Sequence, residues 1–166
     1  MAQDTDRYAA KRVINAAELA TGPTMTQPEI FRTYLSDGDS AVRYWCVIGI
    51  LRQGAAAVDV AANALRTALK DEAGNVRILA AEALARYSNP SDLQPSIEVL
   101  LREADAVKGS NYLAVAALNS LTEIGAEKIK PYRKQIAALP KENMKDVERS
   151  RGYVGRAIEY LLEITA

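Results

Sequence analysis

A repeat of 34 residues runs through the chain and constrains its fold more than any other feature. Asp37, Asp71 and Asp105 stand 34 residues apart, and Arg43 and Arg77 keep the same interval. Small and apolar residues recur at the same step: Gly49, Ala83 and Ala117; Ile50, Leu84 and Leu118; Val47, Ala81 and Val115. A period of this length is typical of stacked supersecondary units, each of which covers the apolar face of its neighbour.

Later copies keep the period less strictly. Asn111 stands where the next Arg would fall, and Arg151 resumes the series after a short insertion. The opening "KRVINAAELA" (11–20) resembles the second helix of an earlier copy. With 166 residues the chain is long enough for one packed domain. We therefore expect a single repeat domain over residues 1–166 and, because the pattern starts within a unit, a C-terminal fragment of a larger protein.

Each unit has the pattern of a helical hairpin. Apolar residues in "VRILAAEALARY" (76–87) recur at three- and four-residue steps, which places them on one face of a helix. Proline and glycine gather between such runs, as in "SNPSD" and "LPKEN". Gly152 and Gly155 fall within the last run, where we expect a kink or a close helix contact. Helices are predicted over residues 6–20, 27–36, 40–53, 57–70, 74–88, 92–105, 110–125, 127–138 and 143–164.

Composition removes most kinds of reaction chemistry. The chain has no histidine, so the commonest general base and metal ligand at neutral pH is missing. No glycine-rich phosphate loop is present either. Lysine plus arginine equals aspartate plus glutamate at 21 each, which does not favour nucleic acid, and no apolar run has the length of a membrane span. The sequence therefore predicts a protein that is not an enzyme, with no catalytic residue, metal site or cofactor.

The recurrent Asp and Arg residues suggest a structural role. Each Asp falls at the end of one helix or in the turn, where it can cap the next helix, and each Arg falls in the first turns of that helix. The Arg fork can then bond to that carboxylate or to the Asp of the neighbouring unit. A line of anion-binding arginines along one surface is the functional alternative. The predicted ties between repeats are Asp37, Arg43, Asp71, Arg77, Asp105 and Arg151.

The repeat alignment also predicts roles for Cys46 and its neighbours. Cys46 takes the small-residue position of Ala80, so we expect a buried thiol without special reactivity. Trp45 takes a position filled by leucine in the next copies, and we expect it to pack in the core or at its edge. Tyr44 and Tyr112 occupy equivalent positions and form either an aromatic strip for sugar or peptide contact or half-buried seams.

The repeating unit resembles HEAT-like repeats, whose second helix begins D-x-x-x-x-x-V-R-x-x-A-A-x-A-L. "DEAGNVRILAAEAL" (71–84) matches closely and "DGDSAVRYWCVIGI" (37–50) fairly well, whereas "DAVKGSNYLAVAAL" (105–118) loses both Val and Arg. The landmarks of tetratricopeptide and ankyrin repeats do not recur at the required offsets. The resemblance implies an all-α fold, an alpha-alpha superhelix (solenoid) of HEAT-like helical hairpins, right-handed or gently curved.

The order of segments is similar to the helical C-terminal region that follows the catalytic domain of some bacterial sulfatases. The match uses "DRYAAKRVINAAELAT" (6–21), "SAVRYWCVIGIL" (40–51), the HEAT-like unit and the closing "YVGRAIEYLLE" (153–163). The nucleophile motif C-x-P-x-R of such enzymes has no counterpart around Cys46, so the resemblance implies no catalytic residue here. It implies a non-catalytic accessory module that packs on a sulfatase-like catalytic domain, in a periplasmic or extracellular location.

A stand-alone scaffold for protein or peptide binding is the alternative function. It predicts a partner held on the second helices of the hairpins by polar and aromatic side chains that do not follow the repeat. In either case the partner is a protein, whether the chain's own catalytic domain or another molecule, with no nucleic acid and no membrane insertion. The candidate partner-binding residues are Tyr44, Arg52, Glu82, Arg86, Tyr112 and Asn119.

Overall fold

The computed structural model describes residues 10–22, 28–141 and 152–166, and within these ranges it contains helices and no strand. The α-helices are α1 (Ala10–Thr21), α2 (Pro28–Leu35), α3 (Ser40–Gln53), α4 (Ala55–Ala68), α5 (Gly74–Tyr87), α6 (Leu93–Glu103), α7 (Asn111–Ile124), α8 (Ala126–Ile129), α9 (Arg133–Ala137) and α11 (Tyr153–Ile164). Short 3-10 turns precede α6 (Pro90–Asp92) and α9 (Lys130–Tyr132).

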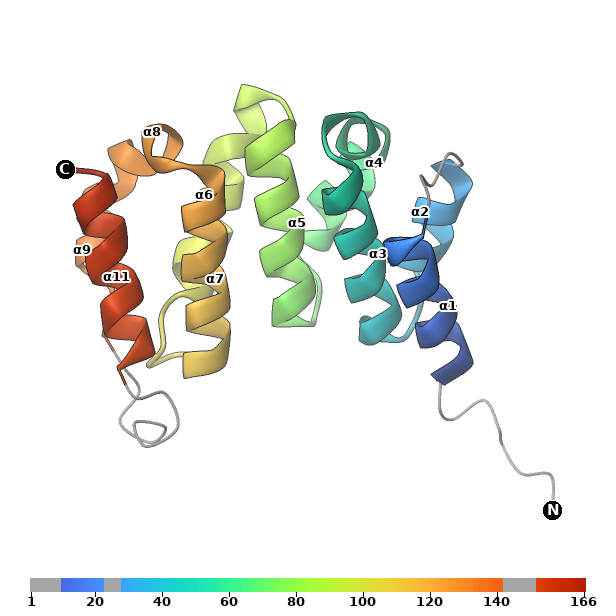
Figure 1. Cartoon of the computed structure of the whole chain (residues 1–166), viewed down its shortest axis with the longest axis horizontal. Helices are drawn as coiled ribbons and strands as arrows, with labels where there is room; N and C mark the ends of the chain where they lie inside the picture. The colour runs from blue at the N-terminus through green and yellow to red at the C-terminus, as the bar shows by residue number, and fades with distance from the viewer. Residues whose placement is uncertain (1–9, 23–27, 142–151) are drawn as a thin grey trace, which may run out of the picture.

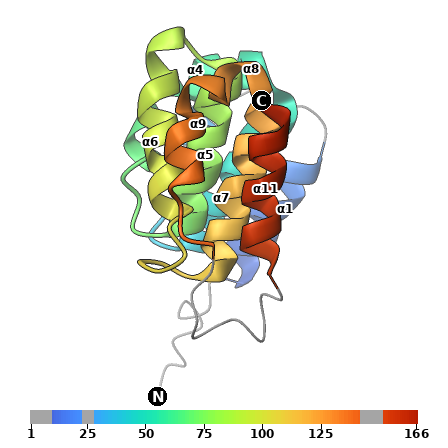
Figure 2. The same ribbon diagram turned by 90° about the vertical axis from the view of Figure 1, so that its left-hand side faces the viewer.

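The helices form two layers (Figures 1 and 2). The first layer is the row α1, α3, α5, α7 and α11, in which each helix packs on the next. The second layer holds α2, α4, α6 and the α8–α9 segment, each packed against the first-layer helices of its own hairpin. This arrangement is a solenoid of stacked helical hairpins, so the predicted all-α fold class is confirmed.

Small side chains allow the first-layer helices to approach closely. Ala80, Ala81 and Ala83 of α5 are fully buried, as are Ala114 and Ala117 of α7. A methyl group in place of a larger side chain lets neighbouring backbones pack at short distance without cavities. The small residues that recur at the repeat period therefore mark the contacts between hairpins.

The turns between helices are held by caps that the sequence supplies. Asp39 accepts a hydrogen bond from the Ala41 N–H at 2.8 Å at the start of α3, and Ser110 accepts one from the Leu113 N–H at 3.2 Å at the start of α7. Gly54 and Gly125, with φ of 76° and 96°, reverse the chain after α3 and α7. Glycine adopts such angles without the steric cost that other residues incur.

The C-terminal part of the chain departs from the predicted helices. The helix predicted over 127–138 is interrupted at Pro131 and becomes α8, a 3-10 turn and α9, because proline lacks an N–H and its ring collides with the preceding turn. Gly152 was expected inside the last helix but instead precedes α11 with φ of 75°. The predicted helical residues 143–151 lie outside the described ranges.

Candidate functional site

Arg43 joins two neighbouring hairpins through Asp71. The Arg43 side chain on α3 donates from Nε to Asp71 Oδ2 at 2.7 Å and from Nη2 to Asp71 Oδ1 at 2.8 Å. Asp71 lies in the turn between α4 and α5, so the bond crosses from one unit to the next. Arg43 Nη1 also donates to the Asp37 carbonyl at 2.8 Å. This geometry is bidentate: two parallel hydrogen bonds join one guanidinium to one carboxylate, which adds geometric specificity to the pairing.

The Arg43–Asp71 pair is largely removed from solvent, with side chains that are 7% and 9% exposed. Burial alone raises the pKa of the Asp71 carboxyl, but hydrogen bonds from Arg43 and from the Ala73 N–H outweigh burial and place the pKa below its ordinary value. The hydrogen bonds to Asp71 raise the pKa of the Arg43 guanidinium. Both groups therefore remain charged around neutral pH, and neither guanidinium nor carboxylate is available to a ligand.

Arg77 repeats this arrangement with a different acceptor. On α5 it donates from Nε and Nη2 to Glu103 at 2.8 and 2.9 Å, and from Nη1 to the Asp71 carbonyl at 2.6 Å. The prediction that Asp105 takes part in a tie between units is wrong for this junction. Asp105 instead accepts the N–H groups of its own loop and pairs with Lys108 at 3.0 Å. Glu103 is the last residue of α6, and its side chain, which is longer than that of an aspartate, reaches Arg77 near the start of α5.

The other predicted ties behave differently from one another. Asp37 accepts the Asp39 N–H at 2.8 Å and approaches Arg12 at 3.4 Å, a contact with α1, the neighbour of α3 in the first layer. Arg151 lies outside the described residues. Asn111, which replaces the repeated Arg, is buried in α7. The described arginines thus do not form a continuous line of free cations.

Sequence reasoning missed a tie in the second layer. Arg66 near the end of α4 donates from Nε and Nη2 to the two carboxylate oxygens of Asp92, each at 2.8 Å. Ser88 Oγ donates to Asp92 at 2.6 Å. Arg66 has a counterpart one repeat earlier in Arg32, but Val58 and Ala126 stand one repeat either side of Asp92. Periodicity therefore gave no signal for the pair.

Three of the candidate partner-binding residues are exposed: Arg52, Tyr112 and Asn119. Tyr112 and Asn119 lie on the solvent side of α7, and Tyr112 is 70% exposed. Tyr44 is half-buried, with its ring against the edge of Trp45 at a centroid distance of 6.0 Å. These positions place the aromatic and amide candidates on the first layer.

Glu82 is not a surface residue, contrary to expectation. It is 8% exposed and accepts hydrogen bonds from Ser120 at 2.8 Å and from Arg86 at 2.8 Å, which joins α5 to α7. Arg86 also contacts Glu123 at 3.5 Å and lies over the Tyr87 ring. The carboxylate of Glu82 is therefore used within the fold, because α5 packs between two neighbours in the row.

Arg52 is exposed, yet its guanidinium is also occupied. It donates to the carbonyl oxygens of Ala20 and Gly22 at the end of α1. Those carbonyls lack partners within their own helix, and a cation at a helix C-terminus is favourable. Arg52 thus caps the neighbouring helix rather than offering a free charge.

Most of the large apolar side chains that are exposed belong to first-layer helices. Among the residues that the structure describes, six large hydrophobic side chains are exposed: Ile14, Tyr112, Tyr153 and Tyr160 on first-layer helices, Val60 on α4 and Val107 in the loop before α7. Tyr153 and Tyr160 are seven residues apart on α11 and so share one face of it. Sequence reasoning missed them, although the seven-residue step in "YVGRAIEY" was a visible signal.

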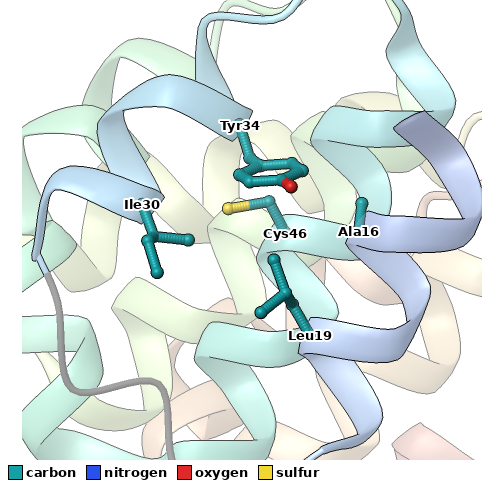
Figure 3. A pocket seen from close by; sticks show the side chains of 5 residues that line it. All are labelled: Ala16, Leu19, Ile30, Tyr34 and Cys46. Atoms are coloured by element: carbon teal, nitrogen blue, oxygen red, sulfur yellow. The ribbon is translucent and has the colours of Figure 1, made fainter. Parts of the chain in front are cut away.

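A small hollow between α1, α2 and α3 contains the cysteine (Figure 3). Its lining is apolar apart from the Tyr34 hydroxyl and the Cys46 thiol and includes Ala16, Leu19 and Ile30. The hollow has no space for a water molecule. Burial raises the pKa of the Cys46 thiol to about 12, so the thiolate is scarce near neutral pH.

We expect Cys46 in the folded protein to react with an aromatic disulfide reagent at pH 8 at least about a hundredfold more slowly than in denaturant, because the thiolate is the reactive form. Absorbance at the released thiol's wavelength measures the rate with and without urea. Equal rates in both solvents would contradict the buried position of this side chain.

No helix among the described residues has both the length and the apolarity that crossing a bilayer requires. Across the same ranges no three histidine, cysteine or carboxylate side chains gather in an arrangement that could hold a metal ion.

Comparison with known proteins gives one family. The model of HEAT repeats matches residues 29–116, which span α2 to the first half of α7. No curated protein and no solved structure matches the chain. The match supports the helical-repeat part of the resemblance and adds nothing for the sulfatase part. Because the matched region covers more than half of the sequence and coincides with stacked helical hairpins, the chain belongs to the HEAT-repeat family.

Proposed function

We propose that the protein is a scaffold that binds another protein on the exposed face of its first layer. The supporting observation is the position of the large exposed hydrophobic side chains, four of six of which lie on first-layer helices of the described chain. Exposed aromatic residues that gather on one side of a molecule are typical of interaction surfaces.

The proposed surface is centred on α7 and α11, which pack side by side. Tyr112 and Asn119 are seven residues apart on α7, and Tyr153 and Tyr160 are seven residues apart on α11. Each pair therefore lies on one face of its helix. Tyrosine supplies a large contact area and a hydroxyl that bonds at the rim, at low entropic cost. The second layer offers a more polar face, with Asp59 and Asn63 as examples on α4.

A pull-down with the full chain tests the proposal through matched variants. Tyr112→Ala and Tyr160→Ala are each expected to reduce recovery of one dominant partner protein roughly tenfold or more, which corresponds to a central interface residue. Val60→Ala, which removes an exposed apolar side chain from the second layer, is the control and leaves recovery unchanged.

The relative losses of partner recovery decide whether the first-layer face is the binding surface. If Val60→Ala reduces recovery as much as Tyr112→Ala does, or if neither tyrosine variant changes it, the first-layer face is not the binding surface. Circular dichroism of each variant confirms that the helices are intact before the comparison is made.

The role as an accessory module of a sulfatase-like hydrolase rests on the resemblance of segments alone. It predicts that the coding sequence preceding residue 1 contains a C-x-P-x-R motif. The scaffold function does not require that motif.

A further inference from the structure

The core of the solenoid is divided into two clusters that meet on one helix. Val76, Ala80 and Leu84 of α5 belong to the cluster formed with α3 and α4, whereas Ile78 and Ala81 of the same helix belong to the cluster formed with α6 and α7. Helix α5 is therefore shared by both halves of the molecule. No other described helix contributes buried residues to both clusters.

The second layer is discontinuous at the same place, and extensive packing is also missing between α6 and the α8–α9 segment. Helix α4 packs against α2 and against α5, and α6 packs against α5 and α7. Extensive packing between α4 and α6 is missing, and their buried side chains belong to different clusters. In Figure 1, α5 stands at the middle of the row, between the hairpins that carry the two clusters.

Arg66 and Asp92 span this discontinuity. Arg66 comes from the last turn of α4, and Asp92 immediately precedes α6. Two parallel hydrogen bonds of 2.8 Å fix the orientation of the pair. Ser88 Oγ donates a further hydrogen bond to the Asp92 carboxylate at 2.6 Å. The Asp92 side chain is 9% exposed, whereas that of Arg66 is 39% exposed. The arginine side chain therefore reaches solvent, and its departure leaves the carboxylate with the Ser88 hydroxyl as a hydrogen-bond donor.

We propose that α5 is a hinge between two halves of the solenoid and that the Arg66–Asp92 pair is the latch that fixes the hinge angle. With the pair closed, α4 and α6 are held together across a boundary where, apart from α5, the partly buried Leu69 at the end of α4 packs against both clusters. With the pair broken, the halves keep their own cores and rotate about α5. The curvature of the first layer then changes, and with it the separation of surfaces on α3 and α7. Hinge closure of this kind needs one shared element and two rigid bodies.

Pulsed electron–electron double resonance on the full chain tests the hinge. Spin labels on Val60→Cys and Glu98→Cys report the distance between α4 and α6, and labels on Glu98→Cys and Lys134→Cys report a distance within the second half. Cys46→Ala removes the native thiol, at a position where the next repeat has Ala80. All four of the positions named for labelling and replacement are on described helices.

Arg66→Gln is expected to broaden the α4–α6 distance distribution roughly twofold and to leave the distribution within the second half unchanged, as rotation of two rigid bodies predicts. Asp92→Asn removes the same pair from the other side and is expected to give the same broadening. Arg102→Gln is the control, because it removes an exposed arginine of α6 that contacts Glu103 but does not reach α4.

Two results would overturn the proposal. In the first, Arg66→Gln and Asp92→Asn remain helical by circular dichroism and both leave the α4–α6 distribution as narrow as in the parent. In the second, both distance distributions broaden alike, which indicates general loosening rather than a hinge at α5. Should one variant fail to fold, the other decides between these outcomes.

Discussion

Leu84→Ala is expected to lower the free energy of unfolding by about 2–5 kcal/mol, the cost of truncating a fully buried leucine. Leu84 is fully buried on α5, in the cluster that this helix shares with α3 and α4. Its counterparts one repeat away, Ile50 and Leu118, are fully buried as well. The truncation leaves a cavity beside α5, the helix on which both halves of the solenoid pack. Neighbouring hairpins therefore cannot make up the lost packing independently of one another.

Urea unfolding followed by circular dichroism measures this loss. Val60→Ala is the control, because Val60 is exposed on α4 and its truncation is expected to change stability by no more than about 0.5 kcal/mol. A Leu84→Ala variant as stable as Val60→Ala would show that this repeat position is not part of a packed core.

Arg43→Ala is expected to cost about 2–4 kcal/mol, because it leaves the buried Asp71 carboxylate without its charged partner. The Asp71 side chain is 9% exposed, and two of its hydrogen bonds come from Arg43. Water cannot replace those donors fully at such a site. Arg102→Ala, which removes an arginine that is 58% exposed, is expected to cost less than about 1 kcal/mol. Urea midpoints of the two variants give the comparison directly.

The same pair gives a pH dependence with a defined sign. The pKa of Asp71 is lower in the folded protein than its ordinary value of 3.8. A lowered carboxyl pKa contributes stability that is fully present above the ordinary value and is lost as the pH falls through the folded value. Stability should therefore decline below about pH 4, and Arg43→Ala should decline less steeply there. An identical acid dependence in the variant would contradict this origin.

Periodicity was enough to predict the architecture because every unit must bury the same face. The residues that recur every 34 positions, among them Ala83 and Leu84, occupy the contacts between helices, and packing imposes the same demand in each copy. The HEAT-repeat match covers the region in which the period is strictest. Pro131 interrupts a helix where the period had already weakened.

Partners of the polar side chains could not be read from the repeat. Arg77 takes Glu103 rather than Asp105, because a glutamate two residues earlier reaches the same point with a longer side chain. Glu82 was placed on the surface by its charge, yet a hydroxyl on α7 and an arginine one turn away satisfy it in the interior. Such pairings depend on the distance between helices, which sequence spacing does not specify. Arg66–Asp92 falls in the same class, since it occurs in one junction only among those described.

A double-mutant cycle on Arg43 and Asp71 tests most directly whether neighbouring hairpins are joined by this ionic tie. Arg43→Ala, Asp71→Ala and the double variant are unfolded in urea, and the non-additivity of their costs gives the coupling energy between the two side chains. We expect a coupling of at least about 1 kcal/mol, since the two groups bond directly across the junction. Costs that add to within about 0.3 kcal/mol, as for independent sites, would contradict the account.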